Sequence, residues 1–171
     1  MIGKNISLRA MEPADADMLY KWENDTSVWL VSNTIEPFSR FVLEQYIMNA
    51  HQDIYTSKQL RLMIDKNDSD IAIGTIDLFD FDPKNLRAGL AILICNEERN
   101  KGYASEALEM MIDYAFQTLQ LHQLYCNISI DNGPSIKLFK SKGFQLIGLK
   151  KEWLLRGDKW IDEYMFQLIK K

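Results

Sequence analysis

The segment Arg99-Asn100-Lys101-Gly102-Tyr103-Ala104 has the residue types of an anion-binding turn. It lies between an apolar stretch typical of a central strand and an amphipathic stretch typical of a helix. A glycine and a small residue at such a turn let the backbone approach a ligand closely. The free N–H groups of the new helix then bind an anion, with help from the helix dipole. The segment therefore predicts a pyrophosphate site, whereas the plainer interpretation is that Gly102 only begins a surface helix.

A second informative segment runs from Asn132 to Phe144. The run 132–135 has an asparagine, a glycine and a proline suited to begin a short helix, and Gly143 is suited to end it. The segment follows the next predicted strand at the distance that one crossover helix requires. The two segments support each other, although Asn132 alone is also a common helix cap and Phe139 alone a common core aromatic.

Periodicity predicts the elements that must position these segments. Alternation predicts strands at 6–10, 60–64, 71–75, 124–130, 144–149 and 160–168, and the run 88–95, apolar on both faces, predicts a central strand. Helical spacing predicts helices at about 13–22, 39–51, 104–119 and 133–142. Turn-forming residues fill 67–70 and 80–85.

The resulting order is β-α-α-β-β-β-α-β-α-β-β, with no internal repeat, linker or low-complexity segment. At 171 residues the chain fits one domain, residues 1–171, of α/β (α+β) class.

Composition narrows the function classes. The net charge of −4 argues against a nucleic-acid partner, which usually requires a strong basic excess. No apolar run approaches the roughly 20 residues that span a bilayer, and residues 1–5 lack the pattern of a signal peptide. Cys95 and Cys126 show no metal-ligand or disulfide spacing and are expected to be buried small hydrophobes. We therefore expect a cytoplasmic protein without a metal or membrane partner.

The motifs of the two segments resemble those of the GNAT superfamily of acetyl-coenzyme A dependent N-acetyltransferases. Within it, the chain is similar to the branch with spermidine and ribosomal-protein N-terminal acetyltransferases. The family pattern R/Q-x-x-G-x-G/A matches Arg99, Gly102 and Ala104. The pattern N-x-x-S/A-x-x-L-Y/F-x-x-x-G-F matches Asn132, Ser135, Leu138, Phe139, Gly143 and Phe144. The resemblance implies a mixed, mostly antiparallel sheet of about seven strands flanked by four helices.

The resemblance also implies where acetyl-CoA binds. Ile92, Leu93 and Ile94 would form a splayed strand edge that pairs with pantetheine, and an N–H near Leu93 or Ile94 would be the oxyanion donor. Residues 99–104 would hold the pyrophosphate: Arg99, Asn100, Lys101, Gly102, Tyr103 and Ala104. Asn132 would bind the pantetheine arm, with Ser135 and Phe139 near the thioester. Lys137, Lys140 and Lys142 are candidates for the 3′-phosphate, or simply a solvated helix face.

Two carboxylates are catalytic candidates by the same resemblance. Asp77 and Glu36 match glutamates of the spermidine enzymes. Asp77 would accept the proton of the attacking amine, whereas Glu36 would help to bind a cationic amine. Without the resemblance, the plainer interpretation is that each is an ordinary exposed acid. Many relatives carry tyrosine where this chain has Phe139, which leaves only Tyr103 and Tyr125 as substitute general acids.

The sequence thus predicts direct transfer of acetyl from acetyl-CoA to a primary amine. The acceptor is a polyamine, a protein N-terminus or another small amine. The alternative from a different class is a non-catalytic acyl-CoA sensor. We expect no nucleic acid and no membrane as partners, and a homo-oligomer is possible because relatives are often oligomeric.

Overall fold

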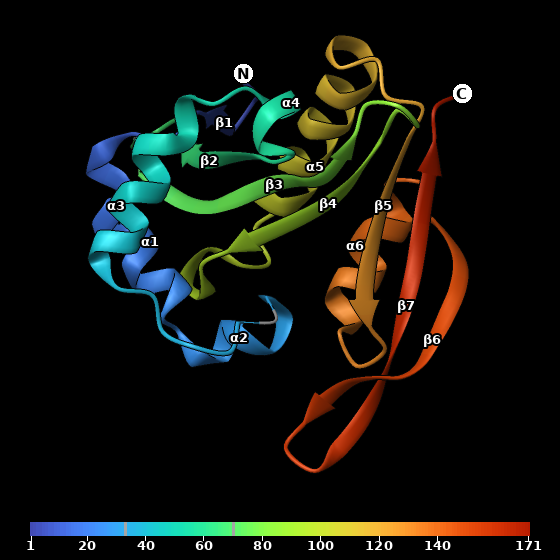
Figure 1. The fold of residues 1–171 in the computed structure, drawn as a ribbon. Helices are drawn as coiled ribbons and strands as arrows, with labels where there is room; N and C mark the ends of the chain where they lie inside the picture. Colours follow the sequence, from blue (N-terminus) through green and yellow to red (C-terminus); the bar gives the residue numbers. More distant parts are fainter. Residues whose placement is uncertain (33, 70) are drawn as a thin grey trace.

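A computed structural model describes residues 1–32, 34–69 and 71–171. Within these residues, strands form one seven-stranded sheet in the order β1-β2-β3-β4-β5-β7-β6 (Figure 1). Only the β4–β5 pair is parallel in this described sheet, which confirms the predicted mixed, mostly antiparallel topology. The strands are β1 (Ile6–Arg9), β2 (Leu60–Lys66), β3 (Ala72–Asp82), β4 (Arg87–Ile94), β5 (Gln123–Ser129), β6 (Gln145–Arg156) and β7 (Lys159–Ile169).

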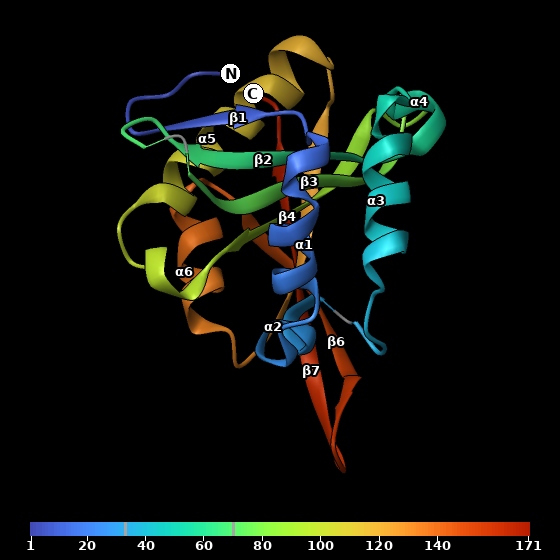
Figure 2. The same ribbon diagram turned by 90° about the vertical axis from the view of Figure 1, so that its left-hand side faces the viewer.

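Helices cover both faces of the sheet (Figure 2). Helices α1 (Ala16–Glu23) and α3 (Arg40–Met48) lie on one face, over a core cluster that includes Leu19, Leu43 and Met63. Helices α5 (Tyr103–Asp113) and α6 (Gly133–Ser141) lie on the other face, over a larger cluster. These four helices match the four predicted ones, and α5 continues as a π-helical turn at Tyr114–Thr118.

Two further short helices lie in stretches for which the sequence predicts no helix or strand, α2 (Thr26–Ser32) and α4 (Ile54–Ser57). Side-chain caps favour both: Asp25 accepts from the Ser27 N–H at 2.9 Å, and Asp53 accepts from the Thr56 N–H at 2.9 Å. Single turns of 3₁₀ helix occupy Pro13–Asp15, Asn49–His51 and Asn96–Glu98. Among the described helices, none combines the length and apolar composition needed to cross a bilayer.

The predicted turns around the β2–β3–β4 meander differ in extent from the structure. The expected turn at 80–85 is partly strand, because β3 continues to Asp82 with an irregular register after Phe79. Of the expected turn at 67–70, Asp70 lies outside the described residues.

The parallel strands β4 and β5 pair only at their beginnings. The register runs from Arg87 opposite Gln123 to Gly89 opposite Tyr125 and then stops, although the strands continue to Ile94 and Ser129. The two strands diverge from that point (Figure 1). We call this opening the splay. Beyond Gly89 and Tyr125, the edges of β4 and β5 that face each other have no partner among the described strands.

Candidate active site

The backbone of β4 presents alternate residues to the splay. The Cys95 N–H donates to the Ile73 carbonyl on β3 at 2.8 Å. Because successive strand residues direct their polar groups to opposite sides, Leu93 also faces β3, whereas Ile92 and Ile94 face the splay. A Cβ on Gly74 would lie 2.0 Å from the Leu93 carbonyl oxygen, which agrees with this direction. The sequence predicts the N–H of Leu93 or Ile94 as the oxyanion donor. The geometry favours the Ile94 N–H, and it makes the Ile92 N–H a further candidate.

The predicted pyrophosphate turn follows β4 after the single 3₁₀ turn Asn96–Glu98. Arg99 Nε donates to the Ile94 carbonyl at 3.0 Å, so this side chain lies at the wide end of the splay. Gly102 is the N-cap of α5 and has a φ of +89°, a backbone conformation that residues with a side chain rarely adopt. Apart from its chain neighbours and the backbone of α5, no described atom lies within 4 Å of the Cβ position of Gly102. The Ser105 N–H donates to the Gly102 carbonyl at 3.1 Å, so the N–H groups of Tyr103 and Ala104 are the ones that α5 leaves for an anion. The turn is therefore open to an anion.

A groove of about 860 Å³ joins the two sequence segments. Its walls come from the turn at 100–105 and from one side of α6. Its volume is within the roughly 300–1,000 Å³ that is usual for small-molecule sites, so the residues present fit a nucleotide cofactor. The lining residues are Asn100, Ser105, Gly133, Pro134, Ile136, Lys137, Leu138, Lys140 and Ser141.

The three lysines of α6 differ in their surroundings. Lys137 and Lys140 line the groove, and Lys140 Nζ lies 5.9 Å from the centroid of the Phe166 ring. Lys142 Nζ instead pairs with Glu109 Oε2 at 2.8 Å. Lys137 and Lys140 are thus better placed than Lys142 for the predicted 3′-phosphate contact.

The predicted cofactor residues of α6 have structural partners. Asn132 Oδ1 accepts from the Ser135 N–H at 3.2 Å, which is a helix cap. Phe139 is 4% exposed and packs edge to face against Phe144, with ring centroids 5.1 Å apart. Phe139 is thus a core residue in this structure. Contacts of Asn132, Ser135 and Phe139 with the cofactor stay predictions.

Asp77 is buried, not exposed, and belongs to an ion-pair cluster on the face covered by α1 and α3. Arg61 Nε lies 2.5 Å from Asp77 Oδ1, and Arg61 Nη1 lies 2.5 Å from Glu23 Oε1. The Arg61 guanidinium also lies 5.5 Å from the Tyr46 ring centroid. We call Glu23, Arg61 and Asp77 the carboxylate cluster. Sequence reasoning missed Glu23 and Arg61; only the β2–β3 register, which places Arg61 opposite Asp77, could have found Arg61.

The carboxylate cluster has two acids for one cation. Burial raises the pKa of Asp77, against the opposing effect of Arg61, and the Glu23 carboxylate raises it further. A carboxylate with a raised pKa is better matched to proton transfer near neutral pH. Asp77 is opposite Ala91 in the β3–β4 register, so it lies next to the strand that borders the splay.

Glu36 lies apart from these interactions. It is exposed in the loop before α3, and it makes no hydrogen bond or ion pair with the residues that the structure describes. Its role in amine binding therefore stays a prediction.

Tyr125 lies where β4 and β5 begin to separate, on the same face as Asp77. Its ring packs edge to face on Phe79 at 5.8 Å, and its hydroxyl donates to Asp80 Oδ2 at 3.0 Å. Burial and this hydrogen bond raise the pKa of Tyr125 to about 12. The other substitute acid, Tyr103, begins α5.

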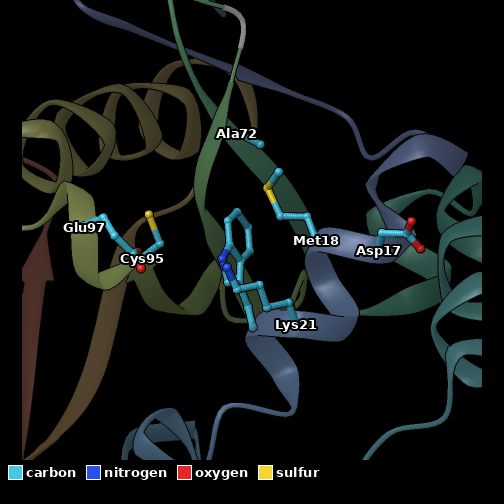
Figure 3. A pocket seen from close by; sticks show the side chains of 7 residues that line it. Asp17, Met18, Lys21, Ala72, Cys95 and Glu97 are labelled. Atoms are coloured by element: carbon cyan, nitrogen blue, oxygen red, sulfur yellow. The ribbon is translucent and has the colours of Figure 1, made fainter.

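A smaller pocket of about 340 Å³ lies between α1 and the ends of β3 and β4 (Figure 3). Trp22, Met18 and Cys95 contribute apolar surface, and Lys21 and Glu97 are charged.

The family comparison decides between the possible uses of this architecture. The profile of the family described as Acetyltransferase (GNAT) domain matches residues 5–145. The chain belongs to the GNAT acetyltransferase family. It is an acetyl-CoA-dependent N-acetyltransferase, and the predicted fold is confirmed.

Individual relatives cover nearly the whole of this acetyltransferase. It is 33% identical to the uncharacterized N-acetyltransferase p20 of Bacillus licheniformis, over 98% of this chain and 94% of the relative. It is 24% identical to spermidine N(1)-acetyltransferase of Vibrio cholerae, over 91% and 88%. The crystal structure of Vibrio cholerae spermidine N-acetyltransferase with CoA and spermine superimposes with a TM-score of 0.89 at 21% identity, over 98% and 96%.

Proposed function

We propose that this enzyme acetylates a small cationic amine, with polyamines as the leading acceptor class. The observation that carries this proposal is the carboxylate cluster, where two acids face one guanidinium and leave one negative charge uncompensated. A buried negative charge beside the splay favours a cationic acceptor. The names of two relatives that act on spermidine support the same class.

In this proposal, acetyl-CoA supplies an activated acetyl thioester. The N–H groups of Ile92 and Ile94 would pair with the extended arm, the turn at 99–104 would hold the diphosphate, and Lys137 and Lys140 would meet the 3′-phosphate. An N–H at Ile92 or Ile94 would also stabilise the negative charge that develops on the thioester oxygen. Most of the acceleration would come from this positioning.

Asp77 would accept the proton of the attacking amine, directly or through a water molecule. An alkylamine has a pKa of about 10.4 and is mostly protonated near pH 7, so it must lose a proton before it attacks. Arg61 holds the carboxylate of Asp77 in one orientation. Attack would be direct, within a complex of both substrates. The departing thiol has a pKa near that of cysteine, about 8.5, so a thiolate can leave although Phe139 replaces the tyrosine.

A cytoplasmic location is part of the proposal. Cys95 and Cys126 are free thiols, as is usual in reducing compartments.

An acceptor screen tests the proposal. Purified enzyme with acetyl-CoA is offered spermidine, spermine, putrescine, free amino acids and peptides with an N-terminal serine, and free thiol release is measured together with product mass. We expect the highest kcat/KM with a polyamine. A preference for peptides or neutral amino acids of 10-fold or more would contradict a polyamine acceptor and favour a ribosomal-protein-like or amino-acid acetyltransferase.

A further inference from the structure

Two aromatic rings lie across the closed end of the splay, where β4 and β5 still pair. The last pair is Gly89 with Tyr125. Phe79 on β3 is opposite Gly89, and its ring packs edge to face on that of Tyr125, with centroids 5.8 Å apart. A side chain of β3 thus reaches a side chain of β5 over the backbone of β4. We call Phe79 and Tyr125 the ring pair.

Gly89 leaves room for the Phe79 ring over β4. A Cβ at residue 89 would lie only 2.3 Å from two atoms of this ring. Packed carbon atoms stay about 3.5–4.0 Å apart, so any side chain at residue 89 would displace the ring. The glycine therefore determines where the Phe79 ring can lie.

The Tyr125 ring is held by Asp80. Its hydroxyl donates to Asp80 Oδ2 at 3.0 Å. Asp80 has φ of +49° and lies in the irregular register after Phe79, where its carboxylate reaches Tyr125. Both rings are half-buried, so each keeps surface that the protein does not cover. The ring pair is thus an ordered apolar wall with a free side.

The core fills the opposite face of the sheet at this end. Leu90, which follows Gly89, and Leu124, which precedes Tyr125, are 1% and 0% exposed. Both belong to the larger core cluster under α5 and α6. Such packing leaves little room for an additional group. An apolar group that enters the splay therefore meets the ring pair or the filled core at the closed end.

We propose that the ring pair limits the acyl group of the donor to about two carbon atoms and so selects acetyl-CoA over longer acyl-CoA thioesters. This inference rests on the cofactor placement of the proposed function. An arm that comes from the turn at 99–104 passes Ile94 before Ile92, so its acyl group points to the closed end. Ile92 and Gly89 are about 10 Å apart along the strand. The acyl group and its contact distance of about 3.5–4.0 Å to the ring pair occupy most of that length.

A longer acyl chain would also hinder the acceptor. Ala91 is opposite Asp77 and is exposed, so the face of the splay that carries the candidate base is the one open to the amine. A chain that bent away from the ring pair would emerge on this face and occupy the path of the amine. Each methylene that does not fit an apolar pocket costs about 10–200-fold in kcat/KM.

A donor series with the purified full chain tests the proposal. Acetyl-, propionyl-, butyryl- and hexanoyl-CoA are compared with one saturating amine. Each transfer breaks the thioester C–S bond, forms an N–C bond and releases one CoA thiol, which is measured. We expect kcat/KM to fall by about 10-fold or more for propionyl-CoA and about 100-fold or more for butyryl-CoA. Equal kcat/KM for acetyl-CoA and butyryl-CoA would overturn the proposal.

Phe79→Ala should open the closed end. The kcat/KM ratio of butyryl-CoA to acetyl-CoA should rise by about 30-fold or more, whereas the affinity for CoA, which has no acyl group, should stay that of wild type. Tyr55→Ala is the matched control. Tyr55 also packs edge to face on a phenylalanine of β3, Phe81, with centroids 5.1 Å apart, but Phe81 belongs to the larger core cluster. This control should keep the wild-type ratio.

The variants decide the proposal in either direction. An unchanged ratio in Phe79→Ala, an equal rise in Tyr55→Ala, or weaker binding of CoA itself by Phe79→Ala would overturn it. If Phe79→Ala does not fold by circular dichroism, Phe79→Leu replaces it. The shorter side chain should then raise the ratio of propionyl-CoA to acetyl-CoA, and an unchanged ratio would overturn the proposal.

Gly102→Glu separates this proposal from the cofactor placement on which it rests. Compared with Gly102→Ala, which has the same backbone strain, it should weaken CoA binding by about 10-fold or more, because a carboxylate meets the diphosphate. Equal CoA affinity of the two variants would overturn the placement and the acyl limit together. Weaker binding by Gly102→Glu, with an unchanged acyl ratio in Phe79→Ala, would overturn the acyl limit alone.

Discussion

Arg61 and Asp77 are joined across the β2–β3 pair by a 2.5 Å hydrogen bond from Nε to Oδ1. The same guanidinium binds Glu23 at the end of α1, so one buried cation fixes a helix and two strands to each other. The candidate base is therefore held by the fold itself. Its geometry and its pKa both depend on Arg61.

Replacing Asp77 with asparagine keeps the shape and removes the proton acceptor. We expect kcat to fall by about 100-fold, as is usual for loss of a general base. Because the pKa of Asp77 is raised, wild-type kcat/KM should rise as pH increases through this raised value, when the carboxyl loses its proton. Initial rates between pH 4 and 9 check both expectations. An Asp77→Asn profile that retains this ascending limb would assign it to another group.

Replacing Arg61 with methionine leaves the buried carboxylate of Asp77 and the partly buried carboxylate of Glu23 without their cation. The free energy of unfolding at pH 7 should fall by about 3–5 kcal/mol. At low pH both carboxyls are protonated, so the loss of stability should be smaller. The loss should grow as pH rises above about 3.9, where the unfolded chain ionises its carboxyls but folding still favours a protonated Asp77. It should reach its full size at the raised pKa of Asp77, above which the folded state also ionises this group. Urea unfolding across this range measures the effect.

Arg40→Met is the control for that series. Arg40 forms an exposed pair with Asp17, so its loss should cost less than about 1 kcal/mol at any pH. Equal losses in the two variants would show that burial of the Arg61 pair contributes nothing.

Lys137 and Lys142 distinguish a phosphate contact from a general charge effect. Lys137→Ala should weaken binding of CoA by about 3–10-fold and leave binding of 3′-dephospho-CoA unchanged, because one charge-assisted hydrogen bond is lost. Lys142→Ala should change neither, since Lys142 pairs with Glu109. Calorimetric titrations give the four constants. Equal weakening for both ligands would contradict a 3′-phosphate role for Lys137.

Gly74 and Gly133 form a matched pair for stability. A Cβ on Gly74 would lie 2.0 Å from a backbone oxygen, whereas nothing lies within 4 Å of that position at Gly133. Gly74→Ala should lower the free energy of unfolding by about 3 kcal/mol, and Gly133→Ala should be nearly neutral. Urea unfolding compares them. A neutral Gly74→Ala would contradict the close β3–β4 approach that directs Leu93 away from the splay.

Local pattern was sufficient for most of the fold. Alternation at 60–64 and the apolar run at 88–95 predicted β2 and β4, although β2 is buried on both faces from Leu62 to Asp65 and Ala91 of β4 is exposed. Helical spacing at 104–119 predicted one helix, which the structure divides into α5 and a π-helical turn that the spacing did not indicate. The helices α2 and α4 were missed because each is too short to show a period, and their caps, Asp25 and Asp53, also suit turns.

The site depends on register, which a single sequence does not reveal. From the sequence, Asp77 could be an exposed acid on a strand bordered by Asp80 and Asp82. Only the structure shows that it is buried and paired with Arg61. The direction of Leu93 and Ile94 likewise depends on which side of β4 pairs with β3. By contrast, the groove between residue 100 and α6 was predictable, because glycine, proline and small residues mark both of its walls.

A crystal structure with bound acetyl-CoA tests the central claim most directly. The account predicts pantetheine amides hydrogen-bonded to Ile92 and Ile94 in the splay and the diphosphate on the N–H groups that follow Gly102. A cofactor bound elsewhere, with the splay and the turn at 99–104 making no contact to it, would contradict the account.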